Sequence, residues 1–158
     1  MSAQIRLRIE LRSERFDPAA LLAQWQEELT VPCEQASATT AAAESVFIGR
    51  MRPTAADGVA LTALELEHYP GMTERQLDRL ALECCTRHGA TSCLVLHRIG
   101  RVLPGEAIVM VATGADRRGP AQRSCQELVE ALKHDAPFWK REWRSDGRGE
   151  WLNGNTPL

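Results

Sequence analysis

The chain has 158 residues, 44% of them hydrophobic, which is enough for one compact domain with a sizeable core and short for two domains. The 19 basic and 21 acidic residues nearly cancel, which excludes the strongly basic surface of a protein that binds duplex nucleic acid. Any basic site must therefore be local. No stretch approaches the roughly 20 apolar residues of a membrane span, and the first residues lack the apolar run of a signal peptide. We expect a soluble, cytoplasmic protein.

Five cysteines are spread along the sequence with no CxxC spacing and no histidine at ligand spacing. This pattern argues against a zinc site and against a disulfide framework. Free cysteines commonly behave as small buried hydrophobic residues. We therefore expect reduced packing residues at Cys33, Cys84, Cys85, Cys93 and Cys125.

The first half of the chain shows two kinds of periodicity. Residues 4–12 alternate apolar and charged side chains, which predicts a strand with one apolar face. Asp17 followed by Pro18 is a typical helix start, and apolar residues recur behind it at helical spacing over roughly 12 residues. Residues 45–49 form an apolar run typical of a buried strand. The run ends in a loop with Pro and Gly, and we expect residues 59–67 to be its hairpin partner.

The second half continues with helices and strands in turn. Thr73 with Gln76 matches a capping box and predicts a second helix that ends near Gly89. Residues 92–98 and 106–113 form two further strands, separated by a Pro-Gly turn suited to type II geometry. Spacings of three and four predict a third helix. Its apolar stripe consists of Ala121, Cys125, Leu128, Val129 and Leu132.

The predicted order of elements is β-α-β-β-α-β-β-α. This order is typical of an α+β domain in which hairpins and about three helices pack as two layers. We expect a single domain over residues 1–146. Residues 147–158 are rich in Gly and Asn and predict a partly mobile tail, with Trp151 as a side chain that could dock.

Cationic residues lie beside structural boundaries in three places. Arg forks bind phosphate and carboxylate oxygens in pairs, whereas Lys provides a mobile charge whose pKa falls on burial or near other cations. A pocket with both types would suit a small anionic substrate and proton transfer during covalent chemistry at a carbonyl. The alternative is that each is a solvated surface charge, and a helix dipole alone would favour Lys133 at a helix end. The positions are Arg50, Arg52, Arg117, Arg118, Lys133, Lys140 and Arg141.

The spacing of two of these residues constrains the site. Arg118 and Lys133 are fifteen residues apart, or about 22 Å along a continuous helix. One small ligand does not reach both. If both belong to one site, either the helix is broken or one residue comes from a second copy of the chain, and we expect a symmetric dimer with shared pockets.

Other candidate residues have weaker claims. His68 and His97 lie at predicted strand ends, where a structural, hydrogen-bonded histidine is more frequent than a catalytic one. Residues 136–139 place two aromatics after a proline, either as an anchor for the last segment or as a wall for a flat ring. The sequence contains no GxGxxG, P-loop or GxSxG motif, so nothing supports a dinucleotide, nucleotide triphosphate or hydrolase site.

Four blocks occur in the order and at nearly the spacing of a known family. They are FIGRMR (residues 47–52), LELEHYPGMTE (64–74), LHRIGRVLPGE (96–106) and LKHDAPFWKRE (132–142). Together they resemble the large, catalytic subunit of molybdopterin synthase. The resemblance implies an α/β hammerhead-type fold and a dimer of large subunits within a heterotetramer.

The resemblance also implies a reaction and a partner. Each large subunit would hold a small ubiquitin-like sulfur carrier whose C-terminal Gly-Gly tail ends in a thiocarboxylate. Two carriers in turn would each give one sulfur to cyclic pyranopterin monophosphate, which becomes molybdopterin with its dithiolene. No metal and no cofactor is implied for this step.

Residue roles follow from the matching motifs. The resemblance implies that Lys133 and Lys140 are the catalytic lysines, which move protons and stabilise charge. It implies that Arg52 binds the substrate, with Arg50 and Met51 beside it.

The remaining implied substrate-binding residues include one departure from the family. Arg118 matches an arginine on the phosphate side of the pterin, which would come from the neighbouring subunit, and Arg141 and Glu142 follow Lys140 in the same pocket-lining run. The family usually has Ala-His-Arg where this chain has Ala-Asp-Arg-Arg, which puts Arg117 at the position of the histidine. Arg117 stays protonated and so holds a phosphate but relays no proton. The rival hypothesis is a non-catalytic paralogue that acts as a carrier-binding interaction module.

Overall fold

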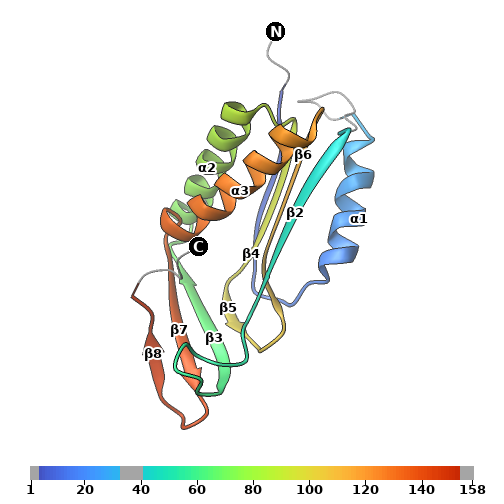
Figure 1. Cartoon of the computed structure of the whole chain (residues 1–158). Coiled ribbons are helices and arrows are strands. Elements are labelled where there is room, and N and C mark those ends of the chain that lie inside the picture. Colours follow the sequence, from blue (N-terminus) through green and yellow to red (C-terminus); the bar gives the residue numbers. More distant parts are fainter. Residues whose placement is uncertain (1–3, 33–40, 154–158) are drawn as a thin grey trace.

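The computed structural model describes residues 4–32 and 41–153. Over these residues three helices combine with two four-stranded sheets (Figure 1). The α+β class and the three helices predicted from the sequence are confirmed. Cys33 and residues 154–158 of the tail lie outside the described residues. Within the described ranges, no helix is both long and apolar enough to cross a membrane.

The first sheet has one parallel and two antiparallel strand pairs. Its strands, in spatial order, are β1 (Arg6–Arg12), β4 (Ser92–Arg98), β6 (Ala107–Ala115) and β2 (Ala43–Arg50). β1 is parallel to β4, whereas β6 is antiparallel to both β4 and β2. The alternating apolar residues of β1, from Ile5 to Leu11, pack together against the main core, as their period-two pattern predicts.

Helices cover both faces of the first sheet, which adds a third layer to the two that were predicted (Figure 1). The helices are α1 (Pro18–Leu29), α2 (Met72–His88) and α3 (Arg118–His134). Cys93 and Val95 of β4 pack with α2 and α3, whereas Leu94 and Leu96 face the opposite way and pack with α1. Because successive strand residues point to opposite faces, β4 is buried along its whole length.

Most helix ends lie where the sequence predicts them. Asp17 Oδ1 accepts a hydrogen bond from the Ala19 N–H at 2.9 Å and caps α1. Gly89 ends α2 in the left-handed conformation, with φ of 78°. α3 runs without a break, and Pro120 is accommodated in its first turn.

The start of α2 differs from the prediction. Gly71 precedes the helix, and its N–H donates to Glu74 Oε2 at 2.6 Å. Thr73 is fully buried, and its hydroxyl accepts a hydrogen bond from the Tyr69 N–H at 2.9 Å. The predicted capping box of Thr73 with Gln76 is therefore wrong, because the Thr73 hydroxyl bonds to the preceding turn.

The second sheet is antiparallel and continues beyond one end of the first (Figure 1). Its strands, in spatial order, are β5 (Gly100–Val102), β3 (Leu61–His68), β7 (Phe138–Arg144) and β8 (Gly149–Trp151). A third apolar cluster fills the junction and includes Met51, Leu64, Leu66 and Val102. The junction between the sheets is therefore packed.

The predicted hairpin of residues 45–49 with residues 59–67 is wrong. β2 pairs with β6 in the first sheet, and β3 pairs with β5 and β7 in the second. The register of β2 shifts at Arg50, and only an isolated Thr54–Ala60 bridge joins the two arms of the loop that follows. The chain changes sheets in this loop because Pro53 lacks the N–H that would continue a ladder.

The four described cysteines are free and buried, in agreement with their predicted packing role. Cys84, Cys85, Cys93 and Cys125 all belong to the core under α2 and α3. Burial raises the pKa of the Cys84 thiol. All four side chains are almost fully buried, so these residues stabilise the core by packing.

Candidate active site

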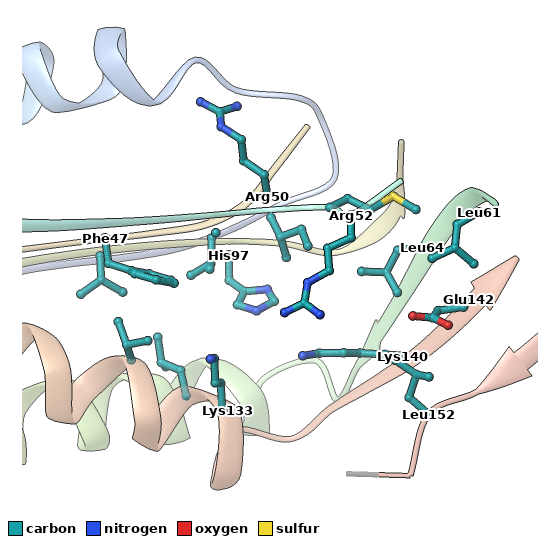
Figure 2. Close-up of a pocket in the computed structure, with 17 residues that line it drawn as sticks. Phe47, Arg50, Arg52, Leu61, Leu64, His97, Lys133, Lys140, Glu142 and Leu152 are labelled. Atoms are coloured by element: carbon teal, nitrogen blue, oxygen red, sulfur yellow. The ribbon is translucent and has the colours of Figure 1, made fainter. Parts of the chain in front are cut away.

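A cavity of about 280 Å³ lies between the last turn of α3, the ends of β2 and β6, and the facing strands β3 and β7 (Figure 2). Its walls are mainly apolar. The apolar lining includes Phe47, Leu61, Leu64, Ile108, Val111, Val129, Leu132 and Leu152. An apolar cavity of this size with a few polar groups suits a small ring-shaped ligand.

Both lysines of the chain line this cavity. The sequence contains only two lysines and 17 arginines, so a random placement of lysines would rarely bring both to one cavity. Lys133 comes from the last turn of α3 and Lys140 from β7, and both side chains point into the cavity (Figure 2). The structure therefore brings together the two residues that the resemblance implies are catalytic.

The pKa of Lys140 is lowered from its ordinary value. Burial disfavours the charged ammonium, and the nearby positive charge of Lys133 disfavours it further. A lysine in this environment gives up its proton more easily than an exposed one. Lys140 is therefore better suited to proton transfer than an exposed lysine.

The segment after β2 contributes three of the predicted residues in different ways. Arg52 points into the cavity, towards the lysines (Figure 2). Met51 is buried in the apolar cluster at the cavity wall. Arg50 also lines the cavity, but its guanidinium points away from the lysines and donates to the Gly105 carbonyl oxygen at 3.3 Å.

Alternate residues of β7 face opposite sides of the second sheet. Glu142 lines the cavity with Lys140, and burial raises the pKa of its carboxyl group. Arg141 lies on the other face, where it pairs with Glu65 at 3.0 Å and contacts the rings of Trp143 and Trp151. The expectation that Arg141 lines the same pocket is wrong, because strand periodicity turns it outward.

Arg117 and Arg118 lie at the far end of α3 from Lys133. Arg117 is the residue before the helix and Arg118 its first residue, and neither lines the cavity. Because α3 is continuous, the estimated separation of about 22 Å holds within one chain. The structure does not bring these two arginines to the lysines of the same chain.

His97 is a cavity residue to which the sequence argument gave a structural role. Its side chain lines the cavity and is 6% exposed. Burial lowers its pKa to about 4, and the charge of Lys140 acts in the same direction. The imidazole is therefore neutral at physiological pH. The LHRIG block was the only feature of the sequence that could have pointed to a site residue here. The apolar pattern predicts only that His97 lies at the end of a strand.

A smaller cavity of about 140 Å³ adjoins the first. Leu132, Lys133, Lys140 and Leu152 line both cavities. The remaining walls of the smaller one are His134, Ala136 and Phe138. The two lysines are thus reached from two sides. Leu152 follows β8, so the predicted tail region contributes a wall.

The polar groups of the site suit recognition of an anion. Arg52, Lys133 and Lys140 face Glu142, so cations outnumber carboxyl groups. A guanidinium fork with two lysines can bind phosphate or carboxylate oxygens. Over residues 4–32 and 41–153, no three His, Cys, Asp or Glu side chains form a group that could hold a metal ion.

Comparison with known proteins identifies the family. The model of the MoaE protein family matches residues 12–135. The chain belongs to the MoaE protein family. A MoaE relative named molybdopterin synthase catalytic subunit, from Rhizobium meliloti (strain 1021), is 37% identical over 154 residues, which cover 97% of this chain and 90% of the relative. The resemblance inferred from the four sequence blocks is confirmed.

Solved MoaE structures share the fold. The molybdopterin biosynthesis MoaE protein from Burkholderia ambifaria MC40-6 has a TM-score of 0.70 at 37% identity, with 96% of this chain and 91% of that chain covered. The molybdopterin synthase from Staphylococcus aureus has a TM-score of 0.74 at 27% identity, with 91% and 96% covered. The MoaE family match ends before Lys140, but the Rhizobium relative spans nearly the whole chain.

Proposed function

We propose that the chain is the catalytic subunit of a molybdopterin synthase of the cytoplasm. A small ubiquitin-like carrier presents a thiocarboxylate at the end of its Gly-Gly tail, and its sulfur passes to cyclic pyranopterin monophosphate. The names of the relatives support the enzyme class. The observation that carries the proposal is the convergence of the only two lysines of the chain on one cavity with Arg52.

The reaction requires charge stabilisation and a proton path. The thiocarboxylate sulfur forms a bond to a pterin side-chain carbon while a carbon–oxygen bond at that carbon breaks, and the departing oxygen takes up a proton. Water then hydrolyses the bond between that sulfur and the acyl carbon of the carrier. The carrier leaves with an ordinary carboxylate, and a second carrier supplies the second sulfur. Lys133 stabilises the negative charge of the thiocarboxylate, and Lys140, with its lowered pKa, transfers protons.

The two adjoining cavities support separate access for the two reactants. The larger, mainly apolar cavity takes the pterin rings, with Arg52 at their anionic side and Met51 and Glu142 in the wall. The smaller cavity lies on the other side of Lys133 and Lys140 and takes the narrow Gly-Gly tail. The reacting sulfur and carbon then meet at the lysines.

The remaining predicted residues need a second copy of the chain. α3 is unbroken, so Arg117 and Arg118 reach a site that contains Lys133 only from a neighbouring subunit. Their guanidinium groups would there bind the phosphate of the pterin. The proposal therefore includes a dimer of catalytic subunits with one carrier on each, which makes a heterotetramer. Arg50, which lines the cavity with its guanidinium turned away from the lysines, and Arg141, which lies on the other face of β7, remain predicted substrate-binding residues.

The proposal is tested by single-turnover assays with a thiocarboxylated carrier and cyclic pyranopterin monophosphate. We expect molybdopterin from the wild type, a loss of roughly 100-fold or more from Lys133→Ala, and full activity from Arg79→Ala. Arg79 is a suitable control because it lies on the exposed face of α2, paired with Glu83.

The rival function predicts a different outcome. Arg117 at the usual histidine position favours a paralogue that binds the carrier without catalysis. Such a module would bind the carrier, bind no pterin and form no product with any carrier. Binding of the pterin to the wild type together with product formation would exclude it.

A further inference from the structure

His97 enters the large cavity from β4, close to where this strand ends. The residue is almost completely buried, and its ring lies among the cavity side chains, on the same side of the sheet as Arg52 and both lysines (Figure 2). The hydrogen bonding of His97 indicates a role in substrate binding.

The hydrogen bond of one ring nitrogen fixes the state of the other. Nδ1 of His97 lies 2.7 Å from the carbonyl oxygen of Arg98. A carbonyl oxygen can only accept, so Nδ1 carries the proton, and Nε2 of the neutral ring has a lone pair. The hydrogen bonds formed within residues 4–32 and 41–153 include one at Nδ1 and none at Nε2. Over this part of the chain, the cavity thus offers Nε2 as an acceptor for a ligand.

The ring is held firmly in this orientation. Phe138 of β7 stacks on it, with ring centroids 3.9 Å apart and an interplanar angle of 11°. The carbonyl of Arg98 is itself fixed, because its side chain is buried and bonds to the Arg101 carbonyl oxygen at 2.8 Å and to Glu106 at 3.3 Å. A preorganised acceptor loses little entropy when a ligand binds.

The other polar side chains at the centre of the cavity are donors. Arg52, Lys133 and Lys140 supply N–H groups, and only Glu142 adds a carboxyl group. A pterin carries N–H donors as well as anionic oxygens, and a buried N–H without an acceptor weakens binding. An aromatic ring system that enters this cavity therefore needs an acceptor inside it. A neutral imidazole meets this need without attracting the lysines as strongly as a carboxylate would.

We propose that His97 contacts and orients the substrate, with Nε2 accepting a hydrogen bond from a ring N–H of the bound pterin. This inference rests on the proposed function and adds a specificity-determining residue to it. Phe138 places the imidazole edge towards the cavity. Ring systems of the same size without a donor at this edge are bound less well.

Equilibrium binding of cyclic pyranopterin monophosphate under anaerobic conditions tests the assignment in four variants. His97→Gln keeps an acceptor near the position of Nε2 and binds within about threefold of the wild type. His97→Asn keeps only a donor for the Arg98 carbonyl, and His97→Phe keeps only the stacking. Both bind roughly 10- to 100-fold more weakly. His88→Gln, outside the cavity, binds as the wild type does.

Each outcome bears on the proposal. Rescue by Gln but not by Asn supports acceptance at Nε2, since a merely structural role would not distinguish the two amides in this direction. Equal affinities of the wild type and His97→Asn, or equal losses in the Gln and Asn variants with unchanged unfolding transitions, would overturn it. A wild type that binds carrier but no pterin overturns the proposed function itself, which separates the two failures.

Discussion

Lys133 and Lys140 act on each other through their charges. Lys140 is desolvated at the base of the cavity, and the neighbouring ammonium of Lys133 adds a repulsion that also lowers its pKa. The two lysines should therefore not titrate independently. This coupling is measurable because the chain has no other lysine.

Removal of Lys133 is expected to raise the pKa of Lys140. In Lys133→Met one of the two causes of the lowered pKa disappears and burial remains. Lys133→Arg, the matched control, keeps the positive charge and leaves the pKa low. The pH dependence of acetylation at Lys140, followed by mass spectrometry, reports the value. Identical profiles for Met and Arg would show that the charge of Lys133 is not the cause.

His97 is expected to make stability depend on pH. Its folded pKa of about 4 lies below the ordinary value of 6.5, so between these values the unfolded chain binds a proton that the folded chain does not. Stability is full above about pH 6.5 and falls as the pH drops towards 4. The other charged side chains that line the cavity with His97 are Arg50, Arg52, Lys133, Lys140 and Glu142, and the positive charge of Lys140 acts on the His97 pKa in the same direction as burial.

The measurement is urea unfolding at pH 7 and pH 5. Between these values the wild type should lose about 2 kcal/mol more than His97→Gln, which lacks the titrating ring. The comparison removes the contribution of all other titrating groups. Parallel losses in the two proteins would mean that His97 is protonated in the folded state.

The sequence predicts the site residues unevenly. Lys133, Lys140 and Arg52 lie in sequence blocks that match motifs of the family, and these motifs imply their roles. The structure brings the three residues together in one cavity. The environment of His97 was not predictable, because it depends on the stacked ring of Phe138, which lies far away in the sequence. The outward direction of Arg141 required knowledge of the strand to which it belongs.

At the scale of elements, the start of α2 is tied to the start of β7. The Thr73 hydroxyl accepts from the Tyr69 N–H at 2.9 Å and donates to the Pro137 carbonyl oxygen at 3.3 Å. Lys140 follows Pro137 by three residues. The buried threonine thus links the two segments that carry the EHYPGM and APFWK motifs.

Replacement of this hydroxyl is expected to destabilise the fold. Thr73→Val keeps the shape but leaves the Tyr69 N–H and the Pro137 carbonyl without their partner, at a cost of about 1–3 kcal/mol. Thr73→Ser restores the hydroxyl and should recover most of the hydrogen-bonding contribution. Urea denaturation of the three proteins measures both effects. Equal stability of the Val variant and the wild type would contradict the assigned contacts.

Elements with an apolar repeat or an apolar run were predicted, and elements without either were not. β1 and the three helices follow apolar repeats, whereas β2, β3, β4 and β6 were predicted without a clear period. β7 has the sequence FWKREWR, with charged residues on both faces: Lys140 and Glu142 line the cavity, and Arg141 forms an ion pair on the other side. The sequence of β7 therefore shows no alternation of apolar and polar residues. β5 and β8 have three residues each, too few to show a period. Strand pairing between distant segments, as for β2 with β6, leaves no local signal.

At the scale of the whole molecule, the length of α3 separates the two groups of predicted residues. Arg118 begins the helix and Lys133 lies in its last turn. In the proposed dimer, each complete site therefore takes Arg118 from one chain and Lys133 from the other, and replacement of either residue affects a different part of each site. Mixing variants tests this arrangement directly.

Arg118→Ala and Lys133→Ala chains are expected to complement each other. Each variant alone should be inactive or nearly so, because every site in its dimer has the same lesion. In mixtures allowed to exchange subunits, about half of the dimers are mixed, and each has one intact site, which gives about a quarter of wild-type activity. Activity is assayed with carrier and pterin before and after exchange. No recovery in mixtures shown to contain mixed dimers would place Arg118 outside the site.

The scarcity of lysine has a consequence for chemical selectivity. Activated acyl groups, such as the thioester that joins the carrier to the pterin after the sulfur has attacked, react with amines but not with guanidinium groups, which stay protonated. Seventeen arginines supply the rest of the basic side chains, so no lysine elsewhere on this chain competes for such a group. Every acylation of a side-chain amine of the chain must therefore occur at Lys133 or Lys140, which line the cavity. The scarcity of lysine thus restricts the reaction of an acyl group with a side-chain amine to this cavity.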